Sequence, residues 1–362
     1  MNKTVFNPRH LQLGARMVEF AGYEMPLEYV GVTAEHLAVR NSAGIFDVSH
    51  MGEIWVTGSR AMDLLHRVLS NDISFLTPGK AQYTCFPNGK GGIVDDLIVH
   101  MFDNNRFLLV VNASNIDKDW EWLQSQNQPG ADLENASGHI SQLAVQGPQA
   151  TRILQKITHE KLDNIKPFTF ITGEIAGHKN IIITATGYTG SGGFELYIES
   201  PDPLHLWDSI VEAGKEFDLK PVGLAARDTL RLEMGYCLYG NDIDDTTSPI
   251  EAGLGWITRF TPGRNFIDSE LLQHQRNTGV SRKLVGFEMM ERGIPRHLYP
   301  LFDTEGIKIG EVTSGTMSPS LKTGIGMGYV KTNYSEPGSD ILVGVRDKML
   351  LARVVRMPFY RG

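Results

Sequence analysis

Residues 81–102 read AQYTCFPNGKGGIVDDLIVHMF. Two runs rich in β-branched and aromatic residues flank the cluster PNGKGG, a pattern typical of two strands joined by a long hairpin loop. A third run of the same kind, RFLLVVNAS at 106–114, follows the turn signal Asp103-Asn104-Asn105. The sequence therefore predicts three consecutive strands in this part of the chain.

Helical patterns lie on both sides of these strands. Residues 59–69 repeat apolar side chains at the i, i+3, i+4 spacing of an amphipathic helix, and NIDKDWEWLQ at 115–124 also favours a helix. Three further helices are expected at 147–157, 203–214 and 223–235, and a second hairpin at 181–198. Because helices and strands alternate irregularly, the pattern indicates an α+β fold rather than a regular βαβ series.

The character of the sequence changes after residue 280. Short strand-like pieces separated by Gly, Pro and Asp follow one another: KLVGFEM, GIKIGEVTS, GIGMGYV and DILVGVRDKMLLARVV. This spacing is typical of a small β-barrel. We therefore expect one region at 1–280 and a C-terminal β-barrel domain at 281–362. The glycines at 324, 326 and 328 fit a tight strand, because no helix pattern follows them.

Composition limits the classes of function. The chain has 362 residues, 41% of them hydrophobic, and a formal net charge of −8, which argues against a broad nucleic-acid surface. No apolar run is long enough to span a membrane, and the first ten residues lack a signal-peptide pattern. Cys85 and Cys237 are the only cysteines, so a disulfide framework is not expected, and the sequence predicts a cytoplasmic protein.

Several familiar catalytic motifs are missing. The sequence contains no GxxxxGK[ST] phosphate loop, no HExxH pair and no GxSxG nucleophile turn. With two cysteines far apart in the sequence and no paired histidines, we expect no metal site.

Two acidic residues interrupt a strand pattern. Asp95 and Asp96 lie within IVDDLIVHM, although carboxylates are rare in strands and costly to bury without partners. Strand alternation sends the two side chains to opposite faces, so at most one of them faces a given cleft. The alternative is that both cap the loop that follows Gly91-Gly92.

Glu195 lies between Phe194 and Leu196 in another strand pattern. A carboxylate there can accept two hydrogen bonds from a planar N–C–N donor edge, or it can form a cross-strand salt bridge. Arg227 can bind a ligand carboxylate or carbonyl, or pair with Asp228 or Glu233. Three aromatic residues near the Gly-rich turns fit either the stacking of a flat ring or ordinary packing: Tyr83, Tyr188 and Trp256.

The chain as a whole resembles the aminomethyltransferase (T-protein) family of the glycine cleavage system. The likeness extends over nearly the full length in the same order. Its segments are FAGYEMPLEY (20–29), FDVSHMGE (46–53), GGIVDDLIV (91–99), VVNASNIDKD (110–119), TGYTG and GGFELY (186–197), GLAARDTLRLE (223–233), CLYGNDID (237–244), SPIEAGLGW (248–256), EVTSGTMSPSL (311–321) and MPFYRG (357–362).

The resemblance implies a reaction and its partners. Proteins of this family transfer the methylene carbon of an aminomethyl group from the lipoyl arm of the H-protein to tetrahydrofolate, forming ammonia and 5,10-methylenetetrahydrofolate. They work together with the P- and L-proteins in glycine catabolism. Their fold is three-lobed, with two interleaved lobes, a C-terminal β-barrel and folate in a central channel. Tetrahydrofolate is thus the expected co-substrate.

The resemblance also assigns roles to individual residues. Asp96 matches the catalytic carboxylate, Glu195 the residue that holds the pterin N–C–N edge, and Arg227 a folate-contacting arginine. Other positions that match the pocket or the tail segment reaching it are Tyr83, Asn112, Tyr188, Trp256, Met51, Tyr360 and Arg361. One departure is visible: this chain reads GYTGSGG where the family usually reads GYTGEDG, so Ser191 and Gly192 replace two acidic residues.

Two other functions are compatible with parts of this pattern. A folate-dependent one-carbon transferase acting on a methylated amine or sulfonium compound shares the fold, but the related flavin oxidases carry a GxGxxG fingerprint that this chain lacks. Related folate-binding proteins assist iron–sulfur cluster assembly and carry a KGCYxGQE-type motif. Here the matching stretch reads MGYCLYGND, so Cys237 fits a packed thiol.

The H-protein is the partner whose contact surface the resemblance leads us to look for. An acidic lipoyl carrier favours a basic patch, for which Arg292 and Arg296 in ERGIPRH are candidates.

Overall fold

The computed structural model describes residues 1–362, which form two compact units. The first unit comprises residues 1–65, 73–83 and 97–228, and the second comprises residues 66–72, 84–96 and 229–362. The division passes through four elements: α3 (Ala61–Val68), β5 (Lys80–Pro87), β6 (Ile93–Asp103) and α7 (Leu224–Glu233). Each unit is described by itself below.

Two sheets organise the first unit. One has the strand order β10-β11-β12-β9-β3-β13 and the other the order β5-β6-β7-β4-β8. The bounds in the first sheet are β3 (Gly44–Asp47), β9 (Ser141–Gln146), β10 (Phe170–Ile175), β11 (His178–Thr184), β12 (Gly193–Ile198) and β13 (Lys220–Pro221). The remaining strands of the second sheet are β4 (Gly52–Thr57), β7 (Arg106–Val111) and β8 (Asp132–Asn135). The strands predicted at 81–114 and the hairpin predicted at 181–198 are thereby confirmed.

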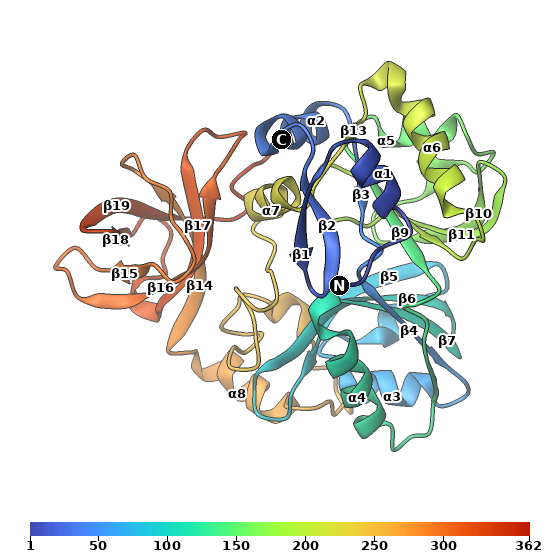
Figure 1. Ribbon diagram of the computed structural model, residues 1–362. Coiled ribbons are helices and arrows are strands. Elements are labelled where there is room, and N and C mark those ends of the chain that lie inside the picture. The colour runs from blue at the N-terminus through green and yellow to red at the C-terminus, as the bar shows by residue number, and fades with distance from the viewer. The chain divides into compact units, whose positions relative to one another are not determined.

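The six-stranded sheet is covered by two helices, α5 (Ala150–Gln155) and α6 (Pro203–Gly214), whose buried residues join its core. Figure 1 shows α6 above β10 and β11. Helix α6 begins where the sequence predicts, because Asp202 accepts a hydrogen bond from the His205 amide and Pro203 fits the first turn. Leu206, Trp207 and Ile210 of α6 join the core of buried strand residues.

A second apolar cluster lies between the two sheets. It joins Trp55 and Val110 of the five-stranded sheet to Phe170 and Tyr197 of the six-stranded one. This cluster matters for the site because Tyr197 and Glu195 lie on the same strand and point to the same face.

The N-terminal segment is tied to the sheets through a buried polar group. It contains α1 (Asn7–Gln12), the hairpin of β1 (Arg16–Phe20) and β2 (Tyr23–Glu28), and α2 (Val32–Asn41). His10 Nε2 lies 2.8 Å from Asp47 Oδ2, and its Nδ1 lies 2.8 Å from the Tyr29 hydroxyl. Burial acts to raise the pKa of Asp47, but the hydrogen bonds that its carboxylate accepts from His10, Thr4 and the Ser49 amide hold that pKa below the ordinary value.

The second unit ends in a closed barrel with the strand order β14-β17-β16-β15-β18-β19 (Figure 1). Its strands are β14 (Arg282–Met289), β15 (Pro300–Phe302), β16 (Lys308–Met317), β17 (Gly324–Lys331), β18 (Asp340–Val345) and β19 (Lys348–Val355). Gly326 is required for packing, since a Cβ there would lie 2.5 Å from the Phe287 ring. The remaining helices of the chain are α4 (Ile116–Gln126) and α8 (Ser269–Thr278).

The predicted α+β class with a C-terminal β-barrel is confirmed. The boundary between the 1–280 and 281–362 regions stays a prediction, although the first barrel strand begins at Arg282. None of the helices combines the length and the apolarity that crossing a bilayer requires.

One ion pair lies in the interior of the second unit. Arg231 Nη1 is 2.7 Å from Asp242 Oδ2, and the two side chains are 2% and 0% exposed. Ser314 bridges the pair, because its hydroxyl lies 2.8 Å from Arg231 Nη2 and 2.9 Å from Asp242 Oδ2. This network fixes the segment after α7 against strand β16.

We expect Asp242→Asn to lower the free energy of unfolding by about 3–5 kcal/mol, because the buried Arg231 guanidinium then loses its counter-charge. Urea unfolding followed by circular dichroism measures the change. The control is Asp340→Asn, which removes the partner of Arg353 in a solvent-exposed pair of the same unit. Equal effects of the two substitutions would contradict the role assigned to the buried pair.

Candidate functional site

Glu195 occupies the middle of β12, where its cross-strand neighbours are Thr184 on β11 and Ala144 on β9. Neither neighbour is basic, so the cross-strand salt bridge is not formed. Instead, the Thr186 hydroxyl donates a hydrogen bond to Glu195 Oε2. On the other oxygen, Oε1, the amide nitrogen of Gln142 is 3.4 Å away.

The ionisation of Glu195 is balanced between opposing effects. Burial raises the pKa of its carboxyl group, whereas the hydrogen bond from Thr186 and the positive charge of Arg227 lower it. Burial is the larger effect, so the pKa lies above the ordinary value. The carboxylate is therefore dependent on its hydrogen-bond donors to remain charged.

Arg227 lies on α7 with its guanidinium carbon 4.3 Å from the centre of the Tyr188 ring. Such a cation–π contact attracts the guanidinium to the face of the ring. The helix begins in a defined place because Glu35 Oε2 accepts a hydrogen bond of 2.9 Å from the Gly223 amide. Glu35 Oε1 accepts bonds from three further amides, those of residues 29–31. The start of the helix that carries Arg227 is thus fixed by one buried carboxylate.

The Gln146 side chain fixes the loop between β11 and β12 through two hydrogen bonds. Its amide nitrogen donates to the Thr186 carbonyl at 3.1 Å, and its oxygen accepts from the Thr189 hydroxyl at 3.0 Å. A Cβ at Gly187 would lie 2.0 Å from Gln146 Oε1, so the close approach requires glycine. At the departure from the family pattern, Ser191 accepts a hydrogen bond of 2.7 Å from Arg40 Nη1.

His50 lies beside this group. Burial lowers the pKa of its imidazole to about 4, and the positive charge of Arg227 acts in the same direction. The ring is therefore neutral at physiological pH. A neutral His50 leaves Arg227 as the positive charge that acts on Glu195.

The other expected residues of the first unit are less closely connected to Glu195. Met51 packs against the cluster between the sheets. Tyr83 lies in β5 and Asn112 directly follows β7, and both side chains are half-buried. The structure thus brings together Glu195, Arg227 and Tyr188, with Thr186, Gln142 and His50 around them.

Asp96 belongs to the second unit and lies on β6, half-buried, whereas Asp95 is fully buried. The loop before this strand is rigidly held. Asn88 Oδ1 accepts hydrogen bonds from the amides of Lys90 and Gly92 at 2.8 and 2.9 Å. A Cβ at Gly92 would lie 1.9 Å from the Asp245 carbonyl oxygen. The Asn88 side chain therefore caps this loop.

The two cysteines lie within electrostatic reach of Asp96. Burial raises the pKa of the Cys85 thiol to about 12, and Asp96 adds to the shift. Burial likewise raises the pKa of Cys237 well above its ordinary value, with Asp242 and Asp96 contributing. Both groups are therefore thiols rather than reactive thiolates, in agreement with a packed Cys237.

The remaining expected residues of the second unit are Trp256, Tyr360 and Arg361. Trp256 is 62% exposed, which is unusual for an indole ring. The C-terminal tail follows β19, and the amides of Phe359 and Tyr360 both donate to the Glu233 carbonyl, at 2.9 and 3.0 Å. This anchors Tyr360 at the end of α7, while Arg361 is exposed.

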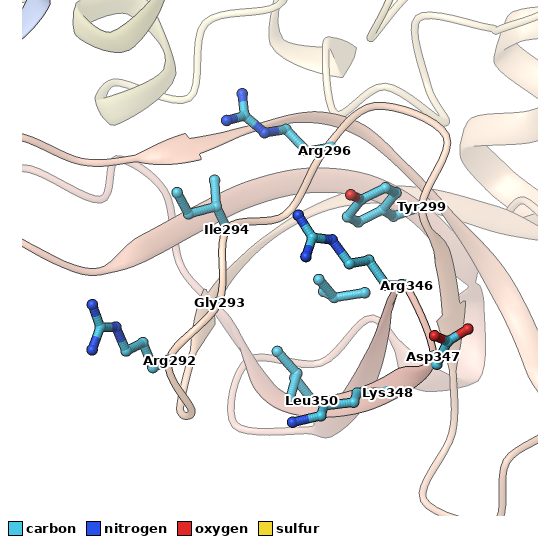
Figure 2. A pocket seen from close by; sticks show the side chains of 10 residues that line it. Arg292, Gly293, Ile294, Arg296, Tyr299, Arg346, Asp347, Lys348 and Leu350 are labelled. Carbon is cyan, nitrogen blue, oxygen red and sulfur yellow. The ribbon is translucent and has the colours of Figure 1, made fainter.

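A pocket of about 500 Å³ opens in the barrel (Figure 2). Four of its lining residues are basic: Arg292 and Arg296 before β15, Arg346 in the turn after β18, and Lys348 on β19. Asp347 is the one acidic residue in the lining, and Ile294, Tyr299 and Leu350 add apolar surface. The barrel therefore presents concentrated positive charge on a protein whose net charge is −8.

Comparisons with known proteins match nearly the full chain to proteins of one kind. The model of the GCVT N-terminal domain matches residues 6–262, and that of the glycine cleavage T-protein C-terminal barrel domain matches residues 282–361. The chain belongs to the glycine cleavage T-protein family. An aminomethyltransferase of Bacteroides fragilis is 60% identical over 99% of both chains, and one of Flavobacterium psychrophilum is 55% identical over 100% of both.

A solved structure of the glycine cleavage system aminomethyltransferase T from Bartonella henselae superposes with a TM-score of 0.92. It is 34% identical in sequence, and the match covers 99% of this chain and 98% of that one. The family predicted from the sequence is thereby confirmed, together with the α+β fold class with a C-terminal β-barrel and the enzyme class, aminomethyltransferase of the glycine cleavage system.

Sequence reasoning missed the residues that surround Glu195 and Arg227. Thr186, Gln142 and His50 are conspicuous only once the strands are paired, because they lie 9, 53 and 145 positions from Glu195. The one available signal was the polar spacing of Thr184 and Thr186, two residues apart at the end of an apolar strand.

Proposed function

We propose that this chain transfers the methylene carbon of aminomethyl-lipoyl H-protein to tetrahydrofolate, releasing ammonia and forming 5,10-methylenetetrahydrofolate. The observation that carries the proposal is the group of Glu195, Arg227 and Tyr188. It combines a buried carboxylate acceptor with a guanidinium placed over an aromatic ring.

The chemistry of this group fits a reduced pterin. The pterin ring offers an N–C–N edge of donors, and a carboxylate is the acceptor that matches such an edge with two parallel hydrogen bonds. Glu195 Oε1 has only a 3.4 Å contact with Gln142, which leaves it able to accept a better donor. We assign folate contacts in addition to Tyr83, Asn112, Met51, Trp256, Tyr360 and Arg361, on the family resemblance.

Asp96 is proposed as the catalytic carboxylate. Tetrahydrofolate supplies the amine nitrogens that accept the carbon. A half-buried, anionic Asp96 can stabilise positive charge that develops on the reacting carbon, and it can accept a proton from nitrogen. The rigid loop at 88–92 fixes the strand on which Asp96 lies, so its carboxylate is oriented before the substrates arrive.

The basic pocket of the barrel is proposed as the docking surface for the acidic H-protein. Arg292, Arg296, Arg346 and Lys348 concentrate positive charge there (Figure 2), and complementary charge accelerates association. Through the H-protein the chain is linked to the P- and L-proteins, and we place the reaction in the cytoplasm.

Asp96→Asn keeps the shape of the side chain and removes its charge. We expect kcat to fall about 10²- to 10⁴-fold, in the range of a lost acid–base or electrostatic group. Tetrahydrofolate affinity should change little. Release of ammonia and methylenetetrahydrofolate from aminomethylated H-protein measures the effect, and near-normal turnover in the variant would contradict the assignment.

Glu195→Gln replaces an acceptor-only carboxylate by an amide that presents a donor. We expect tetrahydrofolate affinity to fall about 10- to 100-fold, the loss typical of a charge-assisted hydrogen bond. Isothermal titration calorimetry on wild type and variant provides the measurement. Unchanged affinity would show that the pterin edge lies elsewhere.

The double substitution of Arg292→Gln and Arg346→Gln should raise KM for aminomethylated H-protein about tenfold while kcat stays near wild type, because only encounter and docking are weakened. Lys308→Gln on β16 is the matched control, since it removes one exposed positive charge of the same barrel outside the pocket. Equal KM values for the double variant and the control would exclude this docking surface.

A further inference from the structure

The side chain of Gln142 on β9 is buried, and its two amide atoms differ in their contacts. The residue is 1% exposed. Its Nε2 lies 3.4 Å from Glu195 Oε1. Its Oε1 is buried, and no hydrogen-bond donor of the chain reaches it. Because a buried acceptor without a donor is costly and uncommon, this oxygen is a candidate for contact with a ligand.

Gln146 lies two positions further along the same strand and on the same face, and its amide is fully used. Its Nε2 donates to the Thr186 carbonyl at 3.1 Å, and its Oε1 accepts from the Thr189 hydroxyl at 3.0 Å. Gln146 thus supports the fold with both ends of its amide. Support of the fold does not explain the oxygen of Gln142, since the chain gives that oxygen no donor.

The backbone of Gln142 is fixed by the segment that precedes β4. Its carbonyl accepts hydrogen bonds from the Val48 amide at 3.0 Å and the Ser49 hydroxyl at 3.1 Å, and its own amide lies 3.0 Å from Ser49 Oγ. Gln142 pairs with Tyr197 across the strands, so its side chain lies on the same face as that of Glu195 and diagonal to it. The amide of Gln142 is therefore held beside the Glu195 carboxylate.

The spacing of Glu195 Oε1 and Gln142 Oε1 fits the two hydrogens of one planar amino group. The nitrogen and oxygen of an amide are about 2.3 Å apart, so Gln142 Oε1 lies no farther than about 5.7 Å from Glu195 Oε1. The N–H bonds of an amino group on an aromatic ring diverge by about 120°, and acceptors about 2.9 Å from its nitrogen are then about 5 Å apart. The two oxygens can therefore accept both hydrogens of the same group.

We propose that Gln142 Oε1 accepts one hydrogen of the amino group on the pterin ring while Glu195 Oε1 accepts the other. The inference rests on the proposed function and deepens it, because it names a residue that selects ligands with this amino group. Glu195 Oε2 accepts from Thr186 and has a second lone pair for the adjacent ring N–H. Gln142 thereby completes the set of acceptors that the donor edge of the ring requires.

The test combines a substitution in the protein with a change in the ligand. Gln142→Met keeps the length of the side chain and removes both polar atoms. Calorimetry measures the binding of 5-methyltetrahydrofolate and of the same compound with a methyl group in place of the ring amino group. In the variant we expect the dissociation constant of the amino compound to rise about tenfold and that of the methyl compound to rise less than about twofold.

Two results of the ligand comparison would overturn the proposal. An equal loss of affinity for both compounds would show that the substitution disturbs packing. An unchanged dissociation constant for the amino compound would show that Gln142 Oε1 makes no contact with the ligand.

The stability of the ligand-free protein provides a second readout, with Gln146→Met as the matched control. We expect the midpoint of urea unfolding of Gln142→Met to equal or exceed that of wild type, because the substitution removes a buried acceptor that has no donor. In Gln146→Met the midpoint should fall, since two hydrogen bonds are lost. Gln142→Leu repeats both measurements if Gln142→Met does not fold. A fall in the Gln142 variants as large as that in Gln146→Met would assign Gln142 to the fold and contradict the proposal.

Glu195→Gln separates this proposal from the proposed function. If Glu195→Gln binds 5-methyltetrahydrofolate as wild type does, the assignment of the pterin edge fails, and the role of Gln142 fails with it. If Glu195→Gln binds weakly while Gln142→Met shows no selective loss for the amino compound, the role of Gln142 alone fails.

Discussion

The rest of the site depends on how the first unit stabilises a carboxylate on a buried strand. Moving an ionised carboxyl group out of water costs several kcal/mol unless hydrogen bonds and opposite charges replace the lost solvation. Glu195 obtains that compensation from Thr186 and Arg227, and each of these is itself held by other parts of the unit. The positions of β11, β12 and α7 are thereby coupled to the charge of the Glu195 carboxylate.

Two other buried carboxylates, Glu35 and Asp242, have several close partners, which distinguishes Glu195 from them. Glu35 accepts four backbone amides, and Asp242 is paired with Arg231 and bridged by Ser314. Both are structural groups that fix a helix start or a loop. Glu195 keeps one oxygen with only a long contact, so it can accept hydrogen bonds from a ligand without giving up its own support.

Much of the fold was predictable because local patterns and tertiary packing agree. The strands at 81–114, the helix that begins after Asp202 and the barrel strands after residue 280 all follow from periodicity and turn residues. The chemistry of Glu195 and Arg227 was also visible as charge in an apolar setting, and the structure brings the two together. Their roles in folate binding, like the catalytic role of Asp96, are proposals.

The supporting residues could not be predicted in the same way. His100 contacts Thr184 across 84 positions, and Glu35 holds Gly223 across 188. A single sequence contains no signal for such pairs, because each residue is ordinary within its own segment. His100 reads as one polar residue in an apolar strand, and only the pairing of the strands shows that its ring lies behind Thr184.

The most direct test of the account is the reaction itself. Purified protein is mixed with aminomethylated H-protein and tetrahydrofolate, and ammonia and 5,10-methylenetetrahydrofolate are measured in the same sample over time. The account predicts that both products form in equal amounts and that omission of tetrahydrofolate suppresses methylenetetrahydrofolate completely and ammonia release strongly. Tight folate binding with no release of either product would contradict it.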